Sequence, residues 1–348
     1  MLQEIRERIV SANRTAAPLR VRGSGTKDFY AEDLVGEVLE VSGHRGIVDY
    51  EPTELVITAR AGTPLSEIET LLAAQGQFLA FEPPAFGADP TLGGIIAAGL
   101  SGPRRMQAGA VRDFVLGAKL LNAEAQELRF GGQVMKNVAG FDVSRLLCGS
   151  LGILGVITEV SLKVLPRPRC EETLRLTLSA ADAIDVFNRL GSLPLPISAA
   201  AWVDGSGWVR LSGAPSAIKA ARERIGGDLV DAATAGSFWD RLRHFELPVL
   251  QAPALWRVSV PSAAPPLRLS APVLLDWGGA VRWYVDEAGK DVRAIAAAAG
   301  GTALRWRGAT TESRFHPLSS AVARIHRRLK ERFDPRGIFN RGRLLRGL

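Results

Sequence analysis

The chain has 348 residues, 47% of them hydrophobic, and its 43 basic against 36 acidic residues give a net charge of +7. This length is sufficient for one large domain or for two to three smaller ones, each with a buried core. The most apolar stretch, LGGIIAAGL, is far shorter than the ~20 residues that cross a bilayer, and the start MLQEIRERIV is rich in charges, so we expect neither a transmembrane helix nor a signal peptide.

The first elements are a helix and a strand. Leu2, Ile5 and Ile9 share one helical face, which predicts a helix over 2–10. The segment PLRVRG, 18–23, alternates in the manner of a strand and runs directly into a glycine-rich turn. The sequence therefore predicts a strand that delivers the chain to this turn.

A second strand is predicted over ELVITARAG, 54–62, and a helix follows it. We expect Thr63 to cap this helix, Pro64 to occupy its first position and Gly76 to end it. From 83 to 165 the sequence is glycine-rich and apolar. Within it, strands are predicted over FVLGAKLLN (114–122), AQELRFGG (125–132) and GVITEVSLKVL (155–165).

The segment PRPR, 166–169, is typical of a linker, and the pattern of predicted elements changes beyond it. Residues 172–231 are predicted to form strands and helices in the order β-α-β-β-α-β, which is the split ferredoxin-like order. Three more strands, a helix and a last strand are predicted over 256–308. A single antiparallel sheet backed by helices accounts for both sets.

The last predicted element is a helix that Asp334 and Pro335 end. It carries an apolar stripe that we assign to the core, made of Leu318, Val322, Ile325, Leu329 and Phe333. Much of the positive charge lies at this end of the chain, without interleaved aromatic residues or a recognition motif. We therefore expect no nucleic-acid partner.

The turn VRGSGTK, 21–27, has the composition of an anion site. It lacks the spacing of a P-loop, since Thr26 precedes Lys27, and Asp28 stands where a Rossmann fingerprint has its third glycine. Glycines nevertheless let neighbouring N–H groups converge, and Lys27 with Arg22 would attract an anion. An ordinary surface turn remains the alternative at this point.

The sequence offers no metal site and no assigned catalytic residue. The two cysteines, Cys148 and Cys170, form no CxxC pair, which indicates a reducing, cytoplasmic compartment and no iron–sulfur cluster held by this chain alone. The histidines are scattered, without a second ligand at metal spacing, and are His44, His244, His316 and His326. Arg314, His316, Trp306 and Arg307 are the nearest catalytic candidates, but each is explained as well by a surface or core position.

Three further stretches accompany the turn: EPPAFGADPTLGGIIAAGLSG, the glycine-repeat segment VMKNVAGFDVSRLLCGSLGILGVITEVSLKVL, and FDPRGIFNRGRL at the end. This set, in this order, resembles the FAD-binding domain of the PCMH-type (vanillyl-alcohol oxidase) flavoprotein family over about 15–168 and the last thirty residues. With GPRR and GAVRDFVLGAKLLN, it is most similar to the FAD-binding E subunits of bacterial glycolate oxidases.

The resemblance implies an α+β fold: a PCMH-type two-subdomain FAD-binding domain over 1–168, a ferredoxin-like antiparallel-sheet cap over 169–315, and a helix and tail, 316–348, that return to the FAD domain. It also implies non-covalent FAD, because no histidine lies in the first turn or near Gly99. The implied cofactor-binding residues are Arg22, Gly23, Ser24, Gly25, Thr26, Lys27, Pro83, Thr91, Leu92, Gly93, Gly94, Gly149, Ser150, Gly152, Gly155, Val156, Ile157 and Asn340.

The family usually has Asn-Pro-Gly-Arg/Lys where this chain has Asn340 followed by Arg341, and Asn340 is expected to make a polar contact with the flavin. The implied function is that of the FAD-binding subunit of a glycolate oxidase complex, with a second FAD-binding subunit and an iron–sulfur subunit as partners. The substrate is then a small 2-hydroxy acid. The location is cytoplasmic, with attachment to the inner membrane through the partners.

Two alternatives stay open. One is a self-sufficient FAD-dependent 2-hydroxy-acid dehydrogenase that uses arginines for the substrate carboxylate. The other is a non-catalytic assembly subunit whose flavin site is vestigial. The His-x-Gly-Asp-Gly-Asn type of metal motif found in related dehydrogenases does not occur in this sequence, which favours the subunit that passes electrons.

Overall fold

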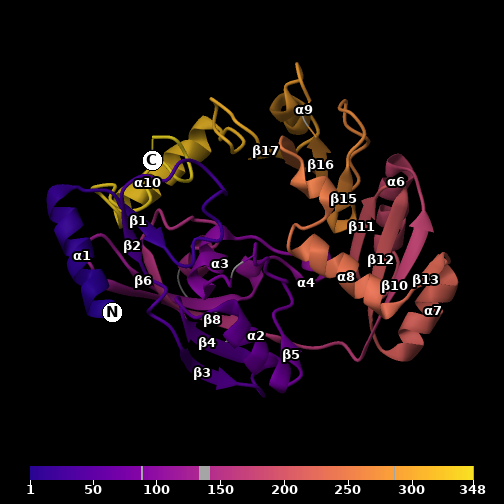
Figure 1. The fold of residues 1–348 in the computed structure, drawn as a ribbon, viewed down its shortest axis with the longest axis horizontal. Coiled ribbons are helices and arrows are strands. Elements are labelled where there is room, and N and C mark those ends of the chain that lie inside the picture. Colours follow the sequence, from indigo (N-terminus) through magenta and orange to yellow (C-terminus); the bar gives the residue numbers. More distant parts are fainter. Residues whose placement is uncertain (88, 133–141, 286, 348) are drawn as a thin grey trace. The chain divides into compact units, whose positions relative to one another are not determined.

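The computed structural model describes residues 1–87, 89–132, 142–285 and 287–347. They form two compact units, of which the first contains Met1–Leu100, Ala110–Pro166 and Pro317–Leu348. The second contains Ser101–Gly109 and Arg167–His316. Figure 1 colours the chain by sequence and shows that both chain ends belong to the first unit. No helix in the described residues is long and apolar enough to cross a membrane.

The first unit combines a strand pair with a five-stranded antiparallel sheet. Strands β1 (Leu19–Arg22) and β2 (Glu37–Glu40) pair in parallel, and α1 (Leu2–Thr15) buries Ile5 and Ile9 in the adjoining core. The sheet has the order β3-β4-β8-β6-β7. Its strands are β3 (Ile47–Glu51), β4 (Val56–Arg60), β6 (Val115–Leu121), β7 (Glu127–Gly131) and β8 (Val156–Lys163).

Short elements connect this framework. A two-stranded pair joins β5 (Gln77–Phe78) to β9 (Leu165–Pro166). Besides α1, the helices of the unit are α2 (Leu65–Ala74), α3 (Leu92–Ala98), the 3-10 helix η1 (Val111–Asp113), α5 (Val143–Leu146) and α10 (Ser320–Phe333). The predicted strands over 18–23, 54–62, 114–122, 125–132 and 155–165 are confirmed, as is the first helix.

The second unit is built on one eight-stranded antiparallel sheet of order β13-β10-β12-β11-β15-β16-β14-β17. Its first four strands follow the predicted ferredoxin-like order, with the apolar faces of α6 (Ala180–Gly191) and α7 (Pro215–Ile225) packed on the sheet. The strands are β10 (Cys170–Thr177), β11 (Ile197–Val203), β12 (Ser206–Gly213), β13 (Asp228–Val230), β14 (Leu255–Ser259), β15 (Leu274–Asp276), β16 (Val281–Val285) and β17 (Thr302–Arg307).

Its helices are α4 (Arg105–Ala108), α6 (Ala180–Gly191), α7 (Pro215–Ile225), α8 (Ala232–Arg243), α9 (Val292–Ala298) and the 3-10 helices η2 (Pro248–Gln251) and η3 (Trp277–Gly279). Figure 1 shows α6, α7 and α9 beside the strands of this sheet. The prediction of one antiparallel sheet backed by helices is therefore confirmed.

Three local features differ from the predictions or were not predicted. Thr63 does not cap α2: its Oγ1 accepts from Gly46 N at 2.9 Å, and α2 begins without a side-chain cap. Helix α8 was not predicted, although Asp231 caps it by accepting from Thr234 N. Helix α3 was not predicted because its two glycines have low helix propensity. Here the missing Cβ of Gly93 permits close contact with Ala61.

A further correction concerns α10, whose apolar stripe was assigned to the core. The helix ends at Asp334 as predicted, but it begins at Ser320, so Leu318 lies outside it. Val322, however, is 41% exposed and Ile325 57% exposed. Lys330 is the buried residue of this helix instead. Apolar periodicity marks a face but not what covers it, and the sequence pattern alone could not identify a lysine as the inward side chain.

Lys330 anchors the end of α10 to the remainder of the first unit. Its Nζ donates to Asp334 Oδ2 at 2.6 Å, to Ile153 O at 2.7 Å and to Phe339 O at 2.7 Å. Asp334 in turn accepts from the N–H groups of Ile338 and Phe339. All three ammonium protons therefore have acceptors, which is the condition under which a buried lysine is tolerated.

This buried pair determines the course of the C-terminal segment. Burial lowers the pKa of Lys330, and the nearby Asp334 carboxylate opposes that effect. The segment following the pair lies beside β1, where Leu19 N donates to Ile338 O and Asn340 N donates to Leu19 O. The pair links the C-terminal segment to the glycine loop, and these backbone bonds link the same segment to β1.

Replacing Lys330 tests this anchor. We predict that Lys330→Met lowers the free energy of unfolding by about 3–5 kcal/mol, because it leaves a buried carboxylate without its counter-charge. Arg332→Met, at an exposed position of the same helix, should change it by less than about 0.5 kcal/mol. Urea unfolding followed by circular dichroism measures both. The double variant Lys330→Met/Asp334→Asn should recover part of the loss, and equal stability of wild type and Lys330→Met would contradict the role.

Candidate functional site

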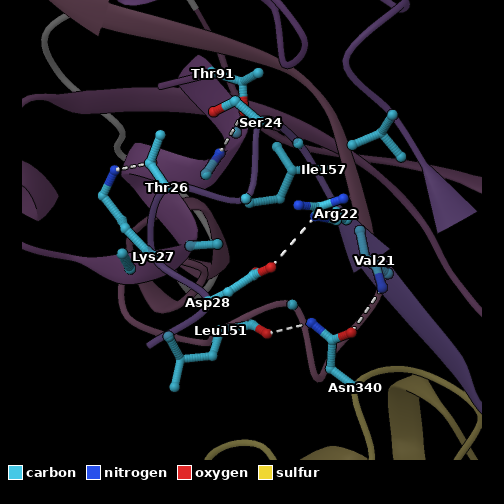
Figure 2. Close-up of a pocket in the computed structure, with 18 of the residues that line it drawn as sticks. Val21, Arg22, Ser24, Thr26, Lys27, Asp28, Thr91, Leu151, Ile157 and Asn340 are labelled. Atoms are coloured by element: carbon cyan, nitrogen blue, oxygen red, sulfur yellow. Dashed lines mark hydrogen bonds and ion pairs between the residues drawn. The ribbon is translucent and has the colours of Figure 1, made fainter. Parts of the chain in front are cut away.

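A pocket of about 110 Å³ lies within the first unit. This volume exceeds what one water molecule needs, so it is large enough for part of a ligand. Four segments build it, as Figure 2 shows: the turn after β1, the start of α3, the glycine loop before β8, and the C-terminal segment. Its lining residues are Val21, Arg22, Gly23, Ser24, Gly25, Thr26, Lys27, Asp28, Leu34, Val41, Pro90, Thr91, Gly93, Gly94, Ala97, Ala98, Leu151, Gly152, Gly155, Ile157, Asn340 and Arg343.

The turn after β1 presents backbone donors to this pocket. Within the described chain, no acceptor takes the N–H groups of five consecutive residues, Gly23 to Lys27. Protein backbone donors are rarely left without acceptors unless water or a ligand serves them. Successive N–H groups in a turn form a concave anion site. The turn is therefore suited to a phosphate or diphosphate group.

Glycine is required at two positions of the pocket. Gly25 has φ of +75° and Gly152 has φ of +73°, a region that side chains with a Cβ rarely adopt. A Cβ on Gly152 would lie 2.7 Å from Asn340 Nδ2, and one on Gly25 would meet the Arg22 guanidinium. The missing Cβ at each position therefore lets the Arg22 or Asn340 side chain pack against the backbone.

The charges around the turn are arranged so that one cation stays available. Asp28 pairs with Arg20, and its Oδ2 lies 3.3 Å from Arg22 Nε. Lys27 has no carboxylate partner among the described residues: its Nζ donates to Thr26 Oγ1 at 3.2 Å and lies 5.6 Å from the centre of the Phe86 ring. Burial lowers the pKa of Lys27 to about 8. An anion in the pocket would supply the missing counter-charge.

Asn340 connects two walls of the pocket (Figure 2). Its Oδ1 accepts from Val21 N at 2.7 Å, and its Nδ2 donates to Leu151 O at 2.6 Å. The following Arg341 stands where the family usually has proline. Its side chain donates to the carbonyl oxygens of Gly337, Ala16 and Arg336. These bonds connect the turn to the preceding residues and to the end of α1.

Arg343 is a pocket residue that the sequence analysis did not select. It is 6% exposed and donates to the carbonyl oxygens of Glu32, Lys27 and Asp28. These bonds hold the end of the turn in place. The sequence did contain a signal for Arg343, because it is the basic residue of the terminal Asn-Pro-Gly-Arg/Lys motif. The motif could not indicate, however, that this side chain binds backbone carbonyl oxygens.

The structure brings thirteen of the predicted cofactor residues to the pocket. Those that line it are Arg22, Gly23, Ser24, Gly25, Thr26, Lys27, Thr91, Gly93, Gly94, Gly152, Gly155, Ile157 and Asn340. The others are Pro83, Leu92, Gly149, Ser150 and Val156, which do not line it. Leu92 and Val156 are both 1% exposed, since their side chains face the core on the reverse side of α3 and β8.

Gly149 lies behind the pocket wall and makes close backbone contact with α3. Its N–H donates to Ile96 O at 3.1 Å, and that of Leu151 donates to Ala97 O at 2.8 Å. A Cβ on Gly99 would lie 2.8 Å from Gly149 N. The glycine repeat therefore positions the loop against the helix end. The part of the quoted segment over 133–141 lies outside the described residues.

No group of three metal-binding side chains is found in the described residues. His316 belongs to the second unit, where its Nδ1 accepts from Ala303 N at 3.3 Å. Trp306 is 3% exposed and stacks on Phe245 with ring centres 4.9 Å apart. It is thus a core residue. Both cysteines are free thiols, and burial raises the pKa of Cys148 to about 12.

Comparison with known proteins identifies an FAD-binding domain in the first unit. Residues 2–131 match the family described as FAD binding domain, and FAD is the cofactor that the sequence predicts. Two crystal forms of alkyldihydroxyacetonephosphate synthase superpose with TM-scores of 0.66 and 0.68 at 16% identity. They cover 97% and 99% of this chain and 75% and 76% of theirs. At this identity they establish the fold.

The chain is also similar in sequence to glycolate oxidase subunits and to a D-lactate dehydrogenase. The chain is 30% identical to glycolate oxidase subunit GlcD of Bacillus subtilis over 52% of this chain and 38% of that protein. It is 26% identical to a D-lactate dehydrogenase of Archaeoglobus fulgidus, over 56% and 44%. Glycolate oxidase subunit GlcE of Escherichia coli is 47% identical over 98% of this chain and 97% of its own length. The chain therefore belongs to the family of the glycolate oxidase subunit GlcE.

Proposed function

We propose that this chain binds FAD non-covalently in the pocket of the first unit and serves as the FAD-binding subunit of a glycolate oxidase complex. The observation that carries the proposal is the row of five N–H groups without acceptors, from Gly23 to Lys27. Their residues line a pocket that also contains glycine backbone and a lysine without a carboxylate partner among the described residues. This donor set is suited to a diphosphate, which is the charged part of FAD.

The protein groups have separable tasks in this proposal. When bound, the isoalloxazine supplies the redox chemistry. The turn after β1 holds the diphosphate through backbone N–H groups, and Lys27 balances its charge. Arg343 holds the end of the turn through the carbonyl oxygens of Lys27 and Asp28, while Asn340 links the glycine loop to β1. The predicted contact of Asn340 with the flavin stays a prediction.

We further infer that glycolate is oxidised at C2 mainly on a partner flavoprotein. Hydride removal from a 2-hydroxy acid requires a base for the hydroxyl proton. Among the described residues that line the pocket, the carboxylate is Asp28, and Arg20 and Arg22 already engage it. This favours a subunit that passes electrons toward an iron–sulfur partner. The pairing of GlcE and GlcD names among the relatives supports a complex of several subunits.

The first prediction tests the backbone geometry of the turn after β1. Gly25→Val should abolish FAD retention, because valine resists φ of +75° and its Cβ would displace the Arg22 side chain. Gly76→Val is the matched control: φ is +63° there, but no atom lies within 4 Å of the added Cβ. Flavin absorbance per chain after purification measures the outcome. Equal flavin content in wild type and Gly25→Val would rule out the assigned turn.

The second prediction follows from the lowered pKa of Lys27. The pKa is about 8 in the free chain, and a bound diphosphate raises it, so FAD binding takes up a proton above that pH. The Kd for FAD should be constant below about pH 7.5 and rise by up to about tenfold per unit above pH 8. Titration of the apo chain with FAD measures this. Lys27→Met should bind more weakly with no such rise; a rise that persists in this variant would assign it to another group.

The third prediction concerns catalysis by the single chain. Purified and loaded with FAD, it should reduce an artificial electron acceptor with glycolate far more slowly than the complete complex. Comparable rates would instead identify a self-sufficient dehydrogenase. A chain that neither retains FAD nor gains thermal stability from it would be an assembly subunit, because a ligand that binds only the native state must stabilise it.

A further inference from the structure

The outer face of helix α10 is an exposed surface that the flavin site does not use. We define it by two aliphatic residues, Val322 and Ile325, and three arginines, Arg324, Arg328 and Arg332. Lys330 points inward and is 5% exposed, so the opposite side of the helix is turned away from the first unit's core. The apolar stripe that the sequence assigns to the core is in part this outer face.

The apolar part of this face is exposed to an unusual degree for its residue types. Ile325 is 57% exposed and Val322 41% exposed, and the two lie three residues apart on one side of the helix. Phe333, farther along, is half-buried and lies beside Phe130, with ring centres 6.1 Å apart. The exposed aliphatic strip is therefore short, and it does not continue into an exposed aromatic residue at the helix end.

The arginines form a row at intervals of four residues. Like charges at this spacing destabilise an isolated helix by about 0.2–0.5 kcal/mol per pair. Across the described chain, none of these three guanidinium groups has an acidic partner, and the one acidic residue of the helix, Glu331, is also without an ion pair. The chain as a whole carries +7. The positive charge of this row is thus not compensated by an acidic side chain within the described residues.

We propose that the α10 outer face docks on an acidic surface of another protein subunit, the second flavin-binding subunit of the same complex. This proposal rests on the proposed function. Arginine is favoured at protein interfaces because its planar group binds carboxylates through two parallel hydrogen bonds. The exposed cations of α10 are all arginines, whereas its lysine is buried.

A protein partner fits these observations better than a lipid surface. Helices that lie in a membrane interface insert a broad apolar face, commonly with Trp, Phe or Leu. Here the exposed apolar strip consists of Val322 and Ile325, and Leu329 is only partly exposed. A narrow aliphatic strip beside a row of arginines has the anatomy of a protein interface, with an apolar centre and a charged rim.

The test compares neighbouring arginines on different sides of one helix. The FAD-loaded full chain is titrated with the purified second flavin-binding subunit from the same organism, at low and at high salt. Arg328→Glu and Ile325→Asp alter the outer face. Arg327→Glu is the matched control, because Arg327 is also exposed and the charge change is identical, but it lies on the side opposite Ile325.

We expect Arg328→Glu and Ile325→Asp each to raise the Kd at least about tenfold, and Arg327→Glu to change it by less than about twofold. High salt should weaken wild-type binding. FAD content and the unfolding midpoint should be the same in all variants, since none touches the pocket or the Lys330 anchor. A loss of FAD in wild type would count against the proposed function rather than against this surface.

Three results would overturn the docking proposal. One is equal weakening by Arg328→Glu and Arg327→Glu, which would indicate a general charge effect. Another is absence of binding between the wild-type chain and this subunit. The third is Arg328-dependent binding to vesicles of phosphatidylcholine and phosphatidylglycerol while subunit binding is unaffected, which would assign the face to a membrane.

Discussion

The buried ion pair between Lys330 and Asp334 is the interaction on which the site depends. A lysine can be buried only if each ammonium proton has an acceptor, and here the acceptors come from the glycine loop, the C-terminal segment and Asp334 itself. The pair therefore requires these regions to be together. The segment continues directly into Asn340, which bonds to β1 and to the glycine loop. The positions of these three walls of the pocket therefore depend on one another.

A site of this kind recognises an anion through backbone rather than through a set of charged side chains. The N–H groups of the turn carry partial positive charge at fixed points, provided that the turn is held in one conformation. Arg343, which itself lines the pocket, contributes to that constraint by donating to the carbonyl oxygens of Lys27 and Asp28 at the end of the turn. The Arg343 guanidinium is thus engaged by backbone carbonyl oxygens, whereas the ammonium group of Lys27 is available to bind the ligand. Two basic residues in one pocket thus have different functions because their acceptors differ.

Much of this could be predicted from the sequence, because strands of β-branched residues and glycine-rich turns have strong local signals. The ferredoxin-like order of the second unit and the turn after β1 belong to this class. The inward position of Lys330 and the role of Arg343 do not, since both depend on carbonyl oxygens that are far away in sequence. Val322 and Ile325 show the converse limit: helical periodicity identified their face, but not that it is exposed.

The most direct test of the central claim is hydrogen exchange of the backbone amides with and without FAD. The amides of Gly23 to Lys27 have no acceptor in the described chain, so they should exchange rapidly in the FAD-free protein and become strongly protected when FAD is bound. The amide of Leu151, which already bonds to Ala97, should be protected in both states. FAD-dependent protection that appears elsewhere, with the amides from Gly23 to Lys27 unchanged, would contradict the account.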